Sequence, residues 1–257
     1  MGFIIALEEY IDETGDTEIQ IPEGITKIAS GSIPYGITSV EIPKSVNEIE
    51  CETFFYDEDL LSITVDPQNP FYCDIDGVLY SKDKKVLVCY PRGREIKTFV
   101  VTDHVTEIGA YAFAGNKNFT SVALSNYVET IGRGAFLLSG LTSIHIPNSA
   151  KTIKQYAFFC CHDLASVTIP DGVTEIEGEA FVACDKLKSI SIPRSVTALR
   201  SRTFMDCYAL ETVEIPESVT EIEEDVFRGC RRLTIRTPRG SRADEYAREN
   251  IIPIAHC

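Results

Sequence analysis

The sequence has few basic residues for its length and no long apolar run. It contains 39 acidic and 24 basic residues, which gives a formal net charge of −15 at pH 7. A nucleic-acid-binding protein of the usual kind needs a basic surface, so we expect no nucleic-acid partner. The apolar run near the start, Phe3 to Leu7, is five residues long, whereas a membrane-spanning helix needs about 20. We therefore expect no membrane insertion, and no signal peptide is recognisable in the chain.

The patterns that mark catalytic or metal sites are also missing. No C-x-x-C pair or H-E-x-x-H motif occurs, and no histidine lies in a nucleophile–base arrangement. The segment Asp74-x-Asp76-Gly77 resembles the start of a calcium loop, but it lacks the third acidic position and the closing glutamate. We interpret it as a plain turn. The sequence therefore predicts no catalytic residue, no cofactor and no metal site.

What the sequence does contain is a repeat. Apolar residues make up 44% of the 257 positions, which is enough for a packed core. Three residue types recur at an interval of 23, and a disulfide framework has no reason to be periodic whereas stacked repeats do. The periodic positions are Cys161, Cys184, Cys207 and Cys230, then Leu141, Leu164, Leu187, Leu210 and Leu233, and then Phe158, Phe181, Phe204 and Phe227.

One repeat unit reads L-x-S-I-x-I-P-x-x-V-T-x-I-x-x-x-A-F-x-x-C-x-x. Its alternating start predicts a short strand, and the proline that follows ends that strand because proline cannot donate to a ladder. Val-Thr-x-Ile predicts a second short strand, and Ala-Phe predicts a single helical or 3₁₀ turn. Such a unit cannot bury its own apolar edge, so the copies must stack. Further copies, some imperfect, are found at residues 19–36, 37–59, 99–118, 119–140 and 141–163.

The cysteine column is interpreted as structural. Zinc needs four ligands that converge on one point, and a column with one thiol per coil does not converge. Earlier copies place other small or turn-forming residues in the same slot, namely Ser139, Asn116, Asp57 and Gly36. A buried thiol behaves as a small apolar group, so we expect no disulfide within the column.

The pattern I-x-I-P-x-x-V-x-x-I-x-x-x-A-F-x-x-C-x-x-L resembles the BspA-type leucine-rich repeat, from about residue 19 to residue 254. The resemblance implies a mainly β, right-handed superhelical solenoid of short strands. It also implies a place at the cell surface or outside the cell, because members are often bacterial or protist surface proteins that bind other proteins. The implied partner is an unidentified protein, such as a host or surface protein.

The repeat register divides the single solenoid into five parts. Residues 66–98 interrupt the period and read as a β-hairpin around a turn at 82–84, an insertion that similar repeats often carry. Near the end, Ser241 suits a helix N-cap and Asn250 a stop, which predicts a cap helix over 242–249. The parts are an N-terminal cap (1–18), repeats (19–65), the insertion (66–98), repeats (99–232) and a C-terminal cap (233–257).

Charge is distributed unevenly along the chain. Residues 1–66 hold 15 acidic and 2 basic residues, a net charge of −13, whereas residues 228–248 hold seven arginines. One interpretation is that the charged caps are solvated and prevent end-to-end association, so that the protein is a monomer. The other is that the arginines bind a partner or another copy of the chain, and in the second case self-association should be weak and salt-sensitive. The candidate partner-binding residues are Arg228, Arg231, Arg232, Arg236, Arg239 and Arg242.

Two functions remain open from the sequence. The first is a non-catalytic protein-interaction or adhesion module with an unknown ligand. The alternative is an enzyme or small-ligand binder with a site in the 66–98 insertion, which offers titratable groups but no motif. Those groups are Asp66, Tyr72, Asp74, Asp76 and Lys82.

Overall fold

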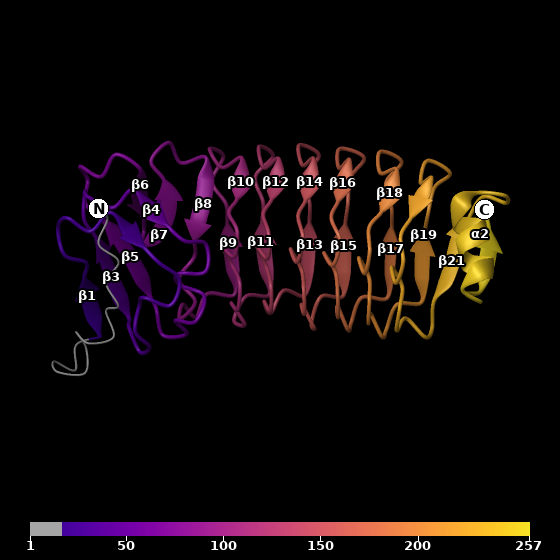
Figure 1. Cartoon of the computed structure of the whole chain (residues 1–257), viewed down its shortest axis with the longest axis horizontal. Coiled ribbons are helices and arrows are strands. Elements are labelled where there is room, and N and C mark those ends of the chain that lie inside the picture. Colours follow the sequence, from indigo (N-terminus) through magenta and orange to yellow (C-terminus); the bar gives the residue numbers. More distant parts are fainter. Residues whose placement is uncertain (1–16) are drawn as a thin grey trace.

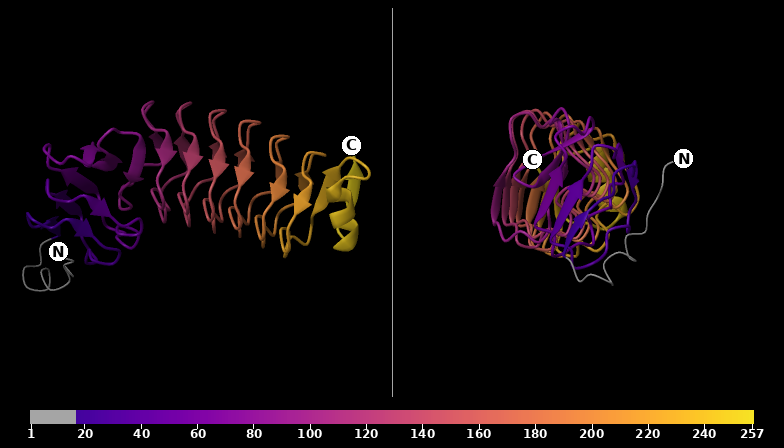
Figure 2. Two further views of the ribbon diagram at one scale, coloured as in Figure 1. Left: turned by 45° about the horizontal axis from the view of Figure 1, so that its top comes forward. Right: turned by 90° about the vertical axis from the view of Figure 1, so that its left-hand side faces the viewer.

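The computed structural model describes residues 17–257, which form an elongated solenoid with its two ends far apart (Figure 1). Viewed along its length, the coils lie one behind another (Figure 2). Most coils contribute one strand of three or four residues and a second of two. The first series comprises β1 (Glu18–Gln20), β3 (Ser39–Ile42), β5 (Ser62–Val65), β9 (Thr98–Val100), β11 (Ser121–Ala123), β13 (Ser143–His145), β15 (Ser166–Thr168), β17 (Ser189–Ser191), β19 (Thr212–Glu214), β21 (Thr234–Thr237) and β22 (Ile254–His256).

The second series lies on another side of the coil. Its members pair in parallel in the same way as the first series, for example β12 with β14 through Ile131 and Ile153. Equivalent positions of successive repeats therefore lie next to each other, as the repeat predicts. The series comprises β2 (Lys27–Ile28), β4 (Glu48–Ile49), β8 (Val86–Cys89), β10 (Glu107–Ile108), β12 (Thr130–Ile131), β14 (Thr152–Ile153), β16 (Glu175–Ile176), β18 (Ala198–Leu199) and β20 (Glu221–Ile222).

The phenylalanine column forms a continuous stack inside the solenoid. Phe158 and Phe181 have ring centroids 5.0 Å apart, Phe181 and Phe204 5.4 Å, and the rings are within 11° of parallel. Tyr90 extends this stack at its start, 5.5 Å from Phe113. Tyr90 was not predicted as part of the stack, because the insertion obscures its distance of 23 residues from Phe113. Aromatic rings stacked in this way stabilise the fold by more than the burial of their apolar area alone would.

The Ala-Phe segment is a series of turns rather than a helical turn. Within one coil, Phe159 N donates to Tyr156 O at 3.0 Å, a bond of the 3₁₀ type. However, Tyr156 (φ 62°) and Cys160 (φ 53°) have left-handed backbone conformations, which stop a regular 3₁₀ helix. As a result, alternate N–H groups point along the axis, and Phe158 N and Cys160 N donate to the next coil at Ala180 O and Val182 O, both at 2.8 Å. These bonds make a third ladder along the solenoid.

The cysteine column supplies hydrogen-bond donors between coils. Cys161 Sγ donates to Phe136 O at 2.9 Å and Cys207 Sγ to Phe181 O at 3.1 Å, with Cys184 and Cys230 placed in the same way. In each case, the thiol meets the carbonyl of the stacked phenylalanine in the preceding coil. In the copies that carry cysteine, the slot therefore holds a small side chain that donates between coils, which the sequence pattern alone did not show.

We expect the column thiols to be chemically inert in the folded protein. Burial raises the pKa of the Cys161 thiol to about 12 and also raises that of Cys184, and the thiolate is the reactive form. With Ellman's reagent at pH 8, the exposed Cys51 and Cys257 should react at once and the three buried column thiols, Cys161, Cys184 and Cys207, only after unfolding. A peptide linking Cys184 to Cys207 in a non-reducing mass-spectrometric digest would contradict both this expectation and the predicted absence of a disulfide.

The insertion consists of two antiparallel hairpins that share a strand. The predicted turn at 82–84 joins β7 (Val78–Ser81) to β8, and an additional strand, β6 (Tyr72–Ile75), pairs with β7. The residues between β6 and β7 are Asp76 (φ 50°) and Gly77 (φ 73°), as a tight two-residue hairpin turn requires. The proposed calcium-like segment is thus a turn, as interpreted above. β8 also pairs in parallel with β10, so it returns the chain to the repeat.

Strand β7 lies between two apolar cores. The N-terminal core gathers the buried residues from Ile19 to Val65 and includes Leu79, whereas the C-terminal core runs from Val78 and Tyr80 to Ala247. Val78, Leu79 and Tyr80 are all nearly inaccessible to solvent. Because successive side chains of a strand point to opposite faces, β7 packs one face on each core. We call this place, formed by β7 and the adjoining segments 54–60 and 89–93, the joint.

The C-terminal end is closed by the predicted helix. α2 (Arg242–Glu249) begins after Ser241, whose Oγ accepts a hydrogen bond from Asp244 N at 3.1 Å. Tyr246 covers the last ring of the stack, with its centroid 6.1 Å from that of Phe227. Within residues 17–257, α2 is the one helix. No helix in that range is long and apolar enough to cross a membrane. The proposed N-terminal cap, except for residues 17 and 18, lies outside the described residues.

Candidate functional site

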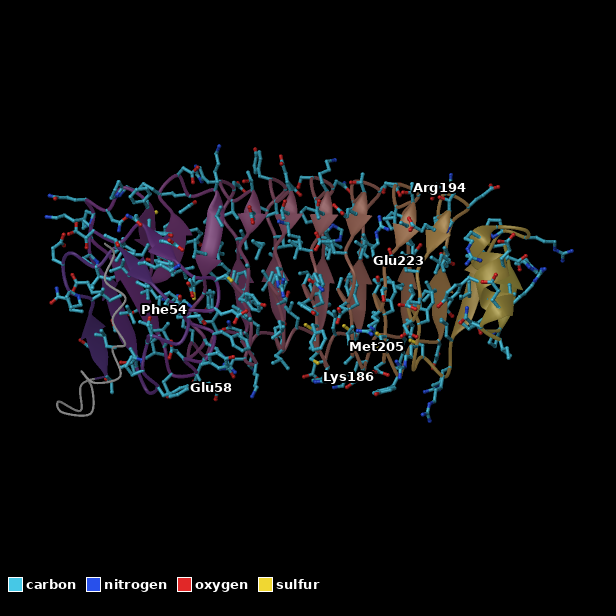
Figure 3. All side chains as sticks on the ribbon, viewed as in Figure 1. Phe54, Glu58, Lys186, Arg194, Met205 and Glu223 are labelled. Carbon is cyan, nitrogen blue, oxygen red and sulfur yellow. The ribbon has the colours of Figure 1, made fainter. Side chains whose placement is uncertain are left out.

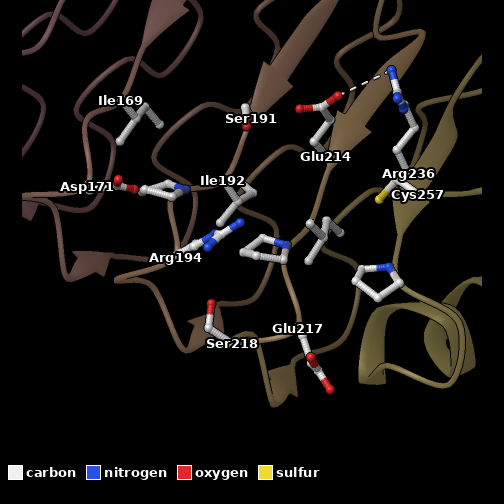
Figure 4. Close-up of a pocket in the computed structure, with 14 residues that line it drawn as sticks. Ile169, Asp171, Ser191, Ile192, Arg194, Glu214, Glu217, Ser218, Arg236 and Cys257 are labelled. Carbon is white, nitrogen blue, oxygen red and sulfur yellow. Dashed lines mark ion pairs between the residues drawn. The ribbon is translucent and has the colours of Figure 1, made fainter.

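A groove of about 700 Å³ runs over the coils at the C-terminal half of the solenoid (Figure 4). It lies where strands β15, β17, β19 and β21 end, and it extends to Cys257. A space of this size is typical of ligand-binding clefts. The groove is therefore the candidate site, and its walls come from equivalent slots of consecutive repeats.

The prolines that end the strands shape the floor of this groove. Pro193, Pro216 and Pro238 line it. Where a different residue fills this slot, its N–H continues the ladder, as in the bond from Cys257 N to Thr237 O at 3.4 Å. Proline has no N–H, so each proline interrupts the ladder and presents its ring instead. The same sequence feature that ends each strand thus builds an apolar floor.

Charged side chains of alternating sign form the rim. Asp171, Arg194 and Glu217 follow the prolines of three successive copies, and all three are exposed. On the strand side, Glu214 and Arg236 form an ion pair at 3.3 Å. An apolar floor with a charged rim is suited to binding, because it offers burial at the centre and specificity at the edge.

Of the arginines selected from the sequence, the structure places Arg236 in the groove. Several of the others are held by acidic residues on the same or adjacent segments rather than free for a partner. These ion pairs are Arg228–Asp225 at 3.5 Å, Arg232–Glu211 at 3.1 Å and Arg242–Glu249 at 3.2 Å. Arg231 and Arg239 are exposed and have no ion-pair partner within residues 17–257.

These ion pairs were not predicted, although the sequence contains a signal for them. Glu211 and Glu214 precede Arg232 and Arg236 by 21 and 22 residues, close to the repeat length. Residues one repeat apart stack, so opposite charges at that distance should pair. Counting the charge of a segment without its neighbouring coil therefore overstated how positive this end is.

Three of the five titratable groups of the insertion form hydrogen bonds that hold its loops. Asp74 Oδ1 accepts a hydrogen bond from Val65 N at 2.9 Å, and Asp66 Oδ1 accepts one from Gln68 N at 2.7 Å. Lys82 Nζ donates to Pro67 O at 3.0 Å. Asp76 lies in the turn, and Tyr72 is half-buried in β6. All five residues proposed for this site are thus parts of the loops, the turn and the strand of the insertion.

The described residues also contain no group of three or more histidine, cysteine, aspartate or glutamate side chains placed to hold a metal ion. His162 Nδ1 lies 2.7 Å from Asp185 Oδ2 at an exposed position, a contact between side chains one repeat apart.

Solved structures with a similar fold are bacterial leucine-rich repeat proteins. The pneumococcal vaccine antigen PcpA is 21% identical with a TM-score of 0.77, and the match covers 93% of this chain and 67% of that chain. A leucine-rich repeat protein from Eubacterium ventriosum is 26% identical with a TM-score of 0.67, over 82% of this chain and 64% of that one. A leucine rich cell surface protein from Faecalibacterium prausnitzii is 28% identical with a TM-score of 0.60, over 90% and 62%.

These comparisons agree with the repeat pattern. This chain spans about two thirds of the length of the solved proteins that it resembles. A search of the curated proteins gave no match. The profile of the BspA type leucine rich repeat region matches residues 11–71 and 89–207 in 6 copies. Since these ranges cover most of the chain, the protein belongs to the BspA-type leucine-rich repeat family.

Proposed function

We propose that the protein is a non-catalytic interaction or adhesion module that binds another protein through the groove and its rim. The observation that supports this most directly is the groove itself, which repeats one slot over several coils and so offers an extended, regular contact surface. Stacked repeats commonly present such surfaces to partners. Because fold alone does not fix function, the proposal rests on this site.

The rim gives the proposal a chemical form. Asp171, Arg194 and Glu217 alternate in sign over three coils, so a partner with the complementary alternation would gain in specificity. Arg236 contributes within its pair with Glu214, and the unpaired Arg239 follows Pro238 and so continues the alternation by one more coil. Arg231 lies away from the groove, in the turn after Cys230. A place at the cell surface or outside the cell is part of the proposal, supported by the similar Faecalibacterium prausnitzii structure, which is described as a cell surface protein.

The proposal is tested by photo-crosslinking at two exposed positions on different edges of the solenoid, Arg194 and Lys186 (Figure 3). A benzophenone amino acid at position 194 should capture the partner from a surface-protein fraction, and the same group at position 186 should not. The identified partner should then bind the double variant Arg194→Glu/Glu217→Arg at least tenfold more weakly. Lys186→Glu, the matched charge reversal, should bind as the wild type does.

Equal capture at both positions would contradict the proposed site. So would a partner that binds the double variant as tightly as the wild type. If position 194 instead captures a second copy of this chain, the groove serves self-association. That outcome is checked by sedimentation at about 20 mM and 500 mM salt, because exposed ion pairs contribute only about 0–1 kcal/mol each and are screened. In that case the groove would serve weak, salt-sensitive self-association instead of binding a different protein.

A further inference from the structure

Asp57 lies buried at the joint without a hydrogen-bond partner. It follows Phe54 by three residues, the same slot that the cysteine column fills later, and only 2% of it is exposed. Neither carboxylate oxygen has a partner among the described residues. Where asparagine or cysteine fills this slot, the side chain donates to a carbonyl of the preceding coil, as Asn116 Nδ2 does to Tyr90 O at 3.5 Å. An ionised carboxylate can only accept, so it does not fit the role that the slot has in the other coils.

The next coil gives Asp57 no donor. There the slot is Gly93, which has no side chain, and the Gly93 N–H is already bonded to Leu60 O at 2.8 Å. Any Cβ at this position would come within 2.6 Å of the carbonyl carbon of Asp59. The two coils therefore approach too closely for a donating side chain at position 93. A buried charge without hydrogen bonds is costly, and the protonated form is favoured instead.

Arg92 is the cation that faces Asp57, and its hydrogen bonds go elsewhere. Its guanidinium donates to Phe55 O at 2.7 Å, Gly115 O at 2.8 Å and Glu58 Oε1 at 2.7 Å. It thereby connects the segment after Phe54 to the later coil that holds Gly115. Its charge favours the ionised form of Asp57, but it does not supply that carboxylate with a bond.

Two more titratable groups face Asp57. The charge of Asp59 raises the pKa of Asp57, and the half-buried Cys89 of β8 is close enough for the Asp57 charge to raise the pKa of its thiol. Burial is the largest influence on Asp57. Together with Asp59 it outweighs Arg92 and raises the pKa of Asp57 from 3.8 to about 7.

We propose that Asp57 is a pH-sensitive switch at the joint between the N-terminal and C-terminal cores. When protonated, its carboxyl supplies the donor that this slot supplies in other coils, and the joint is tight. When ionised, it leaves an unpaired charge in an apolar place, which favours openings that hydrate it. Because β7 and Arg92 link the two cores here, loosening this place frees one core to move relative to the other.

The direction of the effect follows from proton linkage. In the closed joint, Asp57 keeps its proton up to about pH 7, whereas in the opened and hydrated joint it releases the proton near its ordinary value of 3.8. The joint is therefore tightest below about pH 4. It loosens as the pH rises from about 4 to about 7, and it changes no further above that.

The experiment is hydrogen exchange of single amides in the full chain, with rates corrected for the intrinsic pH dependence. The Gly93 N–H, bonded to Leu60 O, reports on the joint, and the Phe181 N–H, bonded to Thr203 O at 2.9 Å, reports on the C-terminal core. The opening constant at Gly93 should rise by up to about tenfold per pH unit between pH 4 and 7 and then level off. At Phe181 it should not follow that course.

The variant Asp57→Asn places the residue of the equivalent slot 116 at the joint and removes the titration. Its Gly93 amide should be protected to the same degree from pH 4 to 8. The matched control is Asp163→Asn, because this exposed aspartate follows Cys161 by two residues as Asp59 follows Asp57, and it should keep the wild-type rise. If Asp57→Asn misfolds, Asp57→Ser takes its place, because Ser139 occupies the same slot in a later coil. A flat wild-type profile at Gly93, or a slope that persists in the Asp57 variants, would overturn the proposal.

Discussion

Replacing Phe181 with alanine should lower the free energy of unfolding by about 3–5 kcal/mol. Phe181 is fully buried at the centre of the stack, with rings 5.0 and 5.4 Å away on its two sides. The substitution removes both stacked contacts and leaves a cavity between Phe158 and Phe204. The third hydrogen-bond ladder passes through the same residue, and it limits how far the backbone can collapse to fill the space.

The damage should extend to neighbouring coils, because the stability of a repeat depends on its interfaces with the next. Urea denaturation followed by circular dichroism gives the loss, and hydrogen exchange at Phe158 and Phe204 shows its spread. Tyr208→Ala is the matched control, since this aromatic side chain is 55% exposed and its loss should be small. A loss below about 1 kcal/mol for Phe181→Ala would mean that the stacked column contributes little to stability.

The regular part of this structure was predictable because every coil meets the same neighbours. Once Phe158, Phe181 and Phe204 share a slot, burial and stacking follow from the interval alone. The cap helix was predictable for a different reason, since Ser241 and Asn250 act locally on a single helix. In both cases, the information lies in residues that either recur or are adjacent.

The features that were not predicted depend on contacts for which the sequence has no interval. Strand β6 was missed because its four residues, Tyr72 to Ile75, are all half-buried, so the strand has no alternation of buried and exposed positions. The groove was missed because proline was considered only as the end of a strand and not as a surface. Arg92 joins carbonyls 37 and 23 residues away, and the first of these distances matches no repeat of this chain.

A second large effect is expected from Leu79→Ala. Leu79 is completely buried and is the residue of β7 that belongs to the N-terminal core, whereas its neighbours Val78 and Tyr80 belong to the C-terminal core. Loss of a buried leucine side chain costs about 2–5 kcal/mol. Here the loss is borne by the smaller core, which has fewer coils over which to distribute it.

The consequence should be a change in cooperativity as well as in stability. If β7 couples the two cores, Leu79→Ala should separate one urea transition into two, with the N-terminal core unfolding first. The order is read from hydrogen exchange at Ile42, in the N-terminal core, and at Phe181, in the other. Leu138→Ala, the same substitution at a side chain that is 39% exposed, should leave a single transition near the wild-type midpoint.

The alternative outcome is a single transition for Leu79→Ala. If Leu79→Ala shifts one unbroken transition to lower urea, the cores are coupled through the strands and Arg92 rather than through the side chains of β7. The variant Arg92→Ala, which removes the bonds to Phe55 O and Gly115 O, should then be the one that separates the transitions. Comparing the two variants at pH 5 and pH 8 also locates the coupling, because only the contacts next to Asp57 should weaken at the higher pH.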